Sequence, residues 1–96
     1  MVKKATTAQS AETLAALPNI GPAMIRDFQQ LGIHTPRDLI GKDPYALYLA
    51  LCDFTGTRQD PCVLDTFIAV TRFMAGDPPH PWWHYTAERK RQFKKV

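Results

Sequence analysis

The sequence predicts an all-α protein of five to six short helices, and three observations support this fold class. Apolar residues recur at helical spacing in several segments, and no segment alternates apolar and polar residues as a half-buried strand does. Three predicted helices begin at a Thr-Pro or Asp-Pro pair, and three end at a glycine. These residue types are typical of helix starts and helix ends, respectively. With 96 residues, the chain has the length of one domain.

We expect a flexible tail over residues 1–9, which are small, polar or basic, and a single helical domain over residues 10–96. The first helix of this domain is predicted to be short. It precedes Pro18, whose ring and missing N–H prevent its continuation.

A tight turn follows, in which Gly21 is expected to adopt a positive φ angle. Pro22 suits the first position of a second helix, which is predicted to reach Leu31 and to end at Gly32. The N–H groups of Ala23 and Met24 lack partners within that helix, so its N-terminus is a potential anion site.

Three further helices are predicted from the same punctuation. The pair Thr35-Pro36 opens a short helix, and Asp43-Pro44 opens a helix to about Phe54 that is apolar nearly all round and is therefore expected to be central and buried. The pair Asp60-Pro61 opens a helix over 61–75, with Asp65 on its outer side. Beyond a proline-rich connector, Thr86 is expected to cap a basic helix over about 86–95.

The stretch from Leu14 to Leu39, with its Pro18-Asn-Ile-Gly-Pro22 turn, resembles the helix-hairpin-helix motif of DNA-repair proteins, polymerases and ligases. In such modules, backbone N–H groups around the glycine bind a DNA phosphate, and hairpin carbonyls can hold a monovalent cation. The resemblance places the phosphate contacts at Asn19, Ile20, Gly21, Ala23, Met24 and Arg26, and the cation on the carbonyls of Ala15, Leu17 and Ile20. The sequence departs from the motif because Asn19 replaces its first glycine, Ala23 a common lysine, and Ile25 a small residue.

A narrower resemblance extends over residues 12 to 90. It rests on Leu17-Pro-Asn-Ile-Gly-Pro22, Asp43-Pro44, Leu47-Tyr48, Leu51-Cys52, Thr55-Gly56, Asp60-Pro-Cys-Val-Leu-Asp65 and Pro81-Trp-Trp83. Together these segments are similar to a family of small bacterial helix-hairpin-helix proteins known as pathogenicity-locus or mitomycin-resistance proteins. The family implies the same helical fold and leaves the biochemical role open.

Positive charge is concentrated at the two ends of the chain. The formal net charge is +3, but residues 11–85 are negative overall, and residues 86–96 hold five basic residues against one acidic residue. Aromatic and basic residues that could stack on bases and bind phosphates are Trp82, Trp83, Arg89, Lys90, Arg91, Lys94 and Lys95. A different reading is that the tryptophans fix the C-terminal segment to the core, with one of the two left exposed.

Cys52 and Cys62, ten residues apart on successive predicted helices, allow two interpretations. Both can be small buried apolar residues, or they can form a reversible redox pair. The three histidines lack the spacing of a zinc site, so we expect no metal other than the monovalent cation.

No nucleophile-base order, no useful pair of carboxylates and no phosphate-binding loop indicates catalysis. We therefore expect a non-enzymatic, sequence-nonspecific DNA-binding or DNA-maintenance accessory protein without a cofactor. The alternatives are a protein–protein interaction adaptor that has lost DNA binding, and a thiol-based stress or drug-resistance protein. A protein partner or a homodimer is compatible with each. No segment predicts a membrane span or a signal peptide, so a cytoplasmic location is expected.

Overall fold

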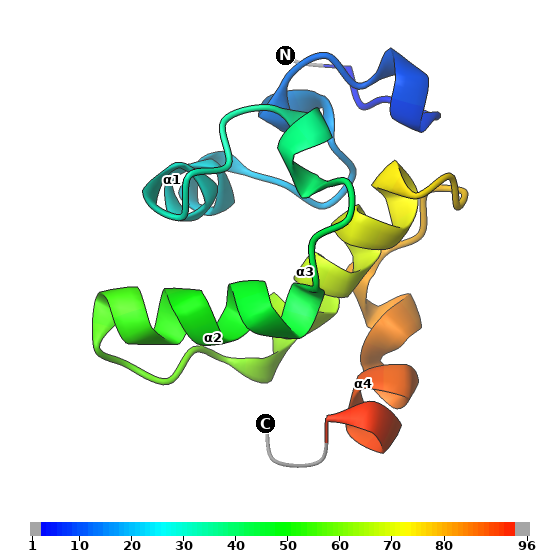
Figure 1. Ribbon diagram of the computed structural model, residues 1–96. Coiled ribbons are helices and arrows are strands. Elements are labelled where there is room, and N and C mark those ends of the chain that lie inside the picture. Colours follow the sequence, from blue (N-terminus) through cyan, green and yellow to red (C-terminus); the bar gives the residue numbers. More distant parts are fainter. Residues whose placement is uncertain (1–2, 94–96) are drawn as a thin grey trace.

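The structure is a computed structural model that describes residues 3–93. These residues form four α-helices and four 3₁₀ turns, with no strand among them. In chain order the elements are η1 (Ala8–Ser10), η2 (Leu14–Ala16), α1 (Pro22–Gln30), η3 (Pro36–Leu39), α2 (Pro44–Thr55), α3 (Pro61–Met74), η4 (Trp82–Tyr85) and α4 (Thr86–Gln92) (Figure 1). The all-α class is confirmed, whereas the count of five to six helices is wrong because several short segments form only a 3₁₀ turn.

The segment before the hairpin is the 3₁₀ turn η2, where the sequence predicted a first helix. Its backbone bonds run from Ala16 N to Thr13 O (3.0 Å) and from Leu17 N to Leu14 O (3.1 Å). Pro18 disfavours helical backbone in the residue before it, and Leu17 is extended, with a ψ of 137°. Only one turn fits before that proline, and the helix-hairpin-helix assignment therefore stays a prediction.

The left-handed residue of the hairpin is Asn19, with a φ of 71°. Gly21 has a φ of −109° and a ψ of −179°, which is ordinary extended backbone, so the expected positive φ at this glycine is wrong. Asparagine tolerates the left-handed region better than most residues, because its short polar side chain can form local hydrogen bonds. The reversal of the chain is therefore made two residues earlier than predicted.

The predicted helix ends are otherwise well reproduced. Asp43 and Asp60 accept hydrogen bonds from the backbone N–H groups two residues on, which opens α2 and α3 as expected. Gly32 follows the C-cap residue of α1 and has a φ of 84°, and Ile33 N donates to Phe28 O (2.8 Å). This is the glycine-capped ending that was predicted, and Ile33 is buried against the core.

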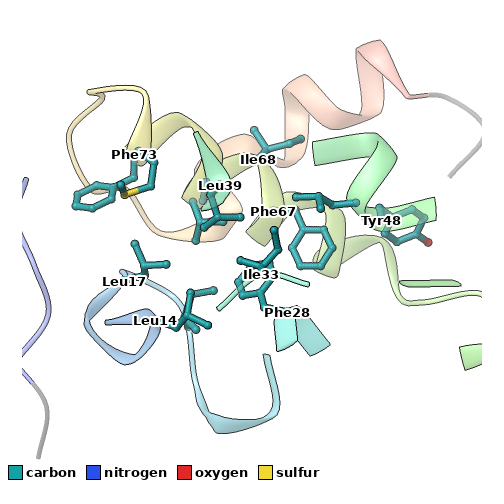
Figure 2. Close-up of a cluster of buried hydrophobic side chains, with 14 of the residues drawn as sticks. Leu14, Leu17, Phe28, Ile33, Leu39, Tyr48, Phe67, Ile68 and Phe73 are labelled. Carbon is teal, nitrogen blue, oxygen red and sulfur yellow. The ribbon is translucent and has the colours of Figure 1, made fainter. Parts of the chain in front are cut away.

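Helix α3 occupies the centre of the fold, and most of its side chains are buried. Phe67 and Ile68 of α3 belong to one buried apolar cluster with side chains from the hairpin region, among them Leu17 and Phe28 (Figure 2). The Phe28 and Phe67 rings stack with their centroids 5.2 Å apart. This apolar contact fixes the hairpin and α1 to the body of the protein.

Helix α2 is only half-buried, which corrects the expectation that it is central. Its main packing partner is α3, which covers the side that carries Leu47, Tyr48 and Leu51. Elsewhere on α2, Leu49 is 47% exposed, and Phe54 in the last turn is 59% exposed. Helix α2 therefore leaves two large apolar side chains in contact with solvent.

Candidate nucleic-acid interface

The start of α1 presents backbone N–H groups to solvent, as the anion-site prediction requires. The described residues offer no acceptor to the N–H groups of Gly21, Ala23 and Met24, whereas the next donor, Ile25 N, bonds to Gly21 O (3.0 Å). Gly21 and Ala23 are exposed, and α1 is nine residues long. The helix dipole therefore adds partial positive charge beside three unpaired donors.

Gly21 leaves open space next to these donors. A Cβ atom added to it would have no heavy atom within 4 Å outside its chain neighbours. Since its backbone is also in a region that any residue adopts, the fold itself does not require glycine here. The lack of a side chain keeps the N-terminus of α1 accessible to a ligand.

The side chains of α1 add little charge to this position. Arg26 is exposed, and Asp27 follows it directly. Burial raises the pKa of Asp27, an effect that the neighbouring Arg26 partly opposes. Met24 and Ile25 are half-buried and pack against the core, so they contribute backbone and shape rather than charge.

The hairpin is joined to the proline-rich connector through Asn19. The Asn19 side-chain amide donates from Nδ2 to His80 O (2.8 Å), and its Oδ1 accepts from Trp82 N (3.2 Å). Asn19 lies 61 to 63 residues away in sequence from these partners, so no local pattern predicts the contact. The residue that departs from the motif's first glycine therefore has a structural role.

This contact places the tryptophan pair beside the hairpin. Trp82 is half-buried, whereas Trp83 is 63% exposed, and the two rings meet edge to face with centroids 5.5 Å apart. The prediction that one tryptophan remains exposed is confirmed. Tyr85, at the end of η4, is buried and fixes this segment to the core.

Lys4 was not predicted to be part of the site, and its ammonium lies on the hairpin carbonyls. Lys4 Nζ donates to Ala15 O (2.8 Å) and to Ile20 O (2.7 Å). These are two of the three carbonyls expected to face a monovalent cation, and the third, Leu17 O, accepts from Ile20 N (3.3 Å). The hairpin carbonyls therefore do not fit the expected cation, because a lysine and a turn bond already use them.

The basic helix contributes fewer free charges than predicted. Arg89 Nε donates to Asp65 Oδ1 (2.8 Å), and Asp65 is fully buried, so the expectation of an exposed Asp65 is wrong. The hydroxyl of Thr86 also donates to Asp65 (2.8 Å), and Tyr85 is the N-cap of α4, so the predicted capping by Thr86 is wrong as well. Asp65 takes this inward position because two donors from α4 compensate its burial.

Lys90 and Arg91 remain exposed on α4, whereas Lys94 and Lys95 lie outside the described residues. Helices α1 and α4 lie well apart in the molecule (Figure 1). The structure therefore joins the tryptophan segment and Lys4 to the hairpin, and it separates α1 from the basic residues of α4.

The two cysteines are free thiols. Cys52 Sγ accepts from Gln59 N (3.4 Å), and burial raises the pKa of the Cys62 thiol, with a further contribution from Asp60. A raised pKa lowers the fraction of reactive thiolate at neutral pH. Within residues 3–93, no group of three His, Cys, Asp or Glu side chains could hold a metal ion.

These features define a small all-helical protein with an open helix N-terminus beside a hairpin turn. Residues 7–91 match the pathogenicity-locus family, and the chain belongs to this family. It is also 40% identical over 85 residues to a protein named mitomycin resistance protein McrB from Streptomyces lavendulae, an alignment that covers 88% of this chain and 81% of that protein.

No solved structure matches the fold at a significant level. Among the helices of the described chain, none combines the length and the apolar character needed to cross a membrane.

Proposed function

We propose that this protein is a non-enzymatic, sequence-nonspecific DNA-binding accessory protein that binds a backbone phosphate at the N-terminus of α1. The observation that supports this proposal most directly is the set of three N–H groups without acceptors beside Gly21. Backbone donors at a helix N-terminus bind phosphate without reading the base. The function is therefore recognition of the DNA backbone.

Two neighbouring features extend this site. The positive charges of Lys4 and Arg26 attract a polyanion to an otherwise acidic body. The exposed Trp83 offers a ring on which an unpaired base can stack, which favours single-stranded or distorted DNA. With few charges at the site, we expect weak binding by one molecule alone.

A salt series tests this proposal. If Lys4 and Arg26 are the two charges that neutralise phosphates, affinity falls about 12-fold between 50 and 200 mM salt; if Lys90 and Arg91 also contact DNA, it falls about 150-fold. Fluorescence anisotropy of a labelled duplex and of a labelled single strand measures this slope. We expect the first case, in which Arg26→Gln reduces the salt dependence of the affinity and Lys90→Gln leaves it unchanged. Failure to bind either probe at low salt contradicts the proposal.

A second candidate function, that of a protein–protein interaction adaptor, is favoured by exposed apolar side chains on α2. Leu49 and Phe54 are large apolar residues in solvent, and exposed apolar surface often marks contact sites. Leu49→Glu replaces one of these side chains without disturbing the core, so it separates the two candidates. An adaptor loses its partner in this variant, whereas DNA binding through α1 is unaffected.

The similarity to a mitomycin resistance protein suggests that this protein contributes to resistance. We propose that such resistance depends on the α1 site rather than on a reaction of the Cys62 thiol, because the raised pKa of Cys62 makes that thiol a poor nucleophile. Survival of cells on mitomycin, with the wild type compared with Gly21→Ala and Cys62→Ser variants, tests this distinction. Loss of resistance only in Cys62→Ser would favour the thiol-based alternative.

A further inference from the structure

The carbonyls of the hairpin form a small acceptor site around the ammonium of Lys4. Ala15 O comes from the turn before Pro18 and Ile20 O from the residue after Asn19, so the two oxygens lie on either side of the reversal. Lys4 Nζ is within hydrogen-bond distance of both, and no other donor in residues 3–93 bonds to either oxygen. One side chain therefore joins the two arms of the hairpin.

The backbone near Lys4 holds this side chain in place. Ala5 N donates to Ala16 O (2.8 Å), one residue beyond the first carbonyl that Lys4 contacts. Thr7 and Ser10 then cap each other around η1, which ends the segment in a defined turn. Because the backbone is attached next to the lysine, the ammonium loses less conformational freedom on binding than an untethered side chain would.

We propose that Lys4 is the built-in cation of this hairpin: its ammonium replaces a bound monovalent metal ion, so the hairpin keeps its shape in the absence of such an ion. A lysine ammonium is a compact single positive charge with three donors. Two of these donors serve Ala15 O and Ile20 O.

Thermal unfolding without DNA tests this proposal. The wild type, Lys4→Met and the control Lys3→Met are melted in potassium chloride and in tetramethylammonium chloride at one ionic strength. Lys3 is the matched control because it is exposed and forms no hydrogen bond or ion pair in the described structure. We expect the wild type and Lys3→Met to have the same Tm in both salts. Lys4→Met should melt about 4–8 °C lower in tetramethylammonium and recover part of this loss in potassium, which can enter the vacated carbonyl site.

Three results would overturn this proposal. The wild type could prove as dependent on potassium as Lys4→Met, which would mean that Lys4 does not replace the ion. Lys4→Met could melt like the wild type in both salts, which would mean that the Lys4 contact does not stabilise the hairpin. It could also have a lower Tm that does not respond to potassium, which would mean that Lys4 stabilises the hairpin without occupying a cation site.

Discussion

Replacing Gly21 with alanine separates a structural role of this glycine from a role in binding. The backbone of Gly21 is extended, and an added Cβ atom meets open space. Alanine restricts the unfolded chain, which stabilises the fold by about 0.4–1 kcal/mol. It is also a poorer N-cap residue than glycine, which costs about 0.5–1 kcal/mol. The two effects nearly cancel, so we expect Tm to change by no more than about 4 °C.

We expect the same methyl group to crowd a phosphate bound at the adjacent N–H groups of α1. Loss of one hydrogen bond to a charged group costs about 1.5–3 kcal/mol, which corresponds to a loss of roughly 10- to 100-fold in affinity. The assay is fluorescence anisotropy of a labelled DNA at low salt, combined with thermal unfolding followed by circular dichroism. A variant that keeps its Tm and loses DNA binding would support the site at α1.

Gly56→Ala is the matched control for this experiment. Gly56 has a φ of 67° at the end of α2, so alanine there is strained by about 1–2 kcal/mol, and no site residue is nearby in sequence. This control should lower Tm and leave DNA affinity unchanged when measured well below its Tm. The reasoning is refuted if Gly21→Ala binds DNA as the wild type does, or if it lowers Tm as much as the control.

The remaining predictions concern the buried ion pair, one carboxylate and one thiol. Arg89→Met leaves the fully buried Asp65 without its charged partner and should reduce the free energy of unfolding by about 3–5 kcal/mol in urea titrations. The control Arg91→Met, at an exposed position, should change it by less than about 0.5 kcal/mol. Equal effects of the two substitutions would contradict the structure. Two backbone N–H groups hold the pKa of Asp38 below its ordinary value of 3.8, so its stabilising contribution is present above that pH and is lost as the pH falls through the lower folded-state pKa. Asp38→Asn should therefore reduce the decrease of Tm in acid, and an unchanged acid profile would disprove this role. Burial raises the pKa of Cys62 above its ordinary value of 9.0. In a variant that lacks Cys52, Cys62 of the folded protein should therefore react with iodoacetamide at neutral pH more slowly than a cysteine peptide does, and the two rates should become equal in urea. Fast alkylation of the folded protein would restore the redox interpretation.

Much of the local structure follows from single residue types. Proline after a capping residue opens α2 and α3 at the predicted positions, because the missing N–H and the fixed φ angle suit a helix start wherever the helix lies. Glycine ends α1 at Gly32, since a left-handed residue is required there regardless of the neighbours in space. The unpaired N–H groups at Ala23 and Met24 could be predicted for the same reason, as they depend only on a helix that begins at Pro22.

The positions of polar side chains depended on the tertiary structure. Asp65 has the spacing of an exposed residue, and only the packing of α4 on α3 supplies the donors that allow its burial. Lys4 is separated by eleven and sixteen residues from the carbonyls it contacts, and Asn19 by more than sixty from its partners. Periodicity and capping rules act over a few residues and cannot register contacts of this range.

The sequence by itself therefore determined the helical class, most helix boundaries and an open N-terminus at α1, because short-range backbone geometry specifies them. The tertiary structure decided what surrounds that N-terminus. It placed the Lys4 ammonium and the tryptophan pair beside the hairpin, and it directed Arg89 away into the core. It also left Leu49 and Phe54 of α2 exposed, because a chain of 96 residues has too few elements to bury every apolar side chain of its helices.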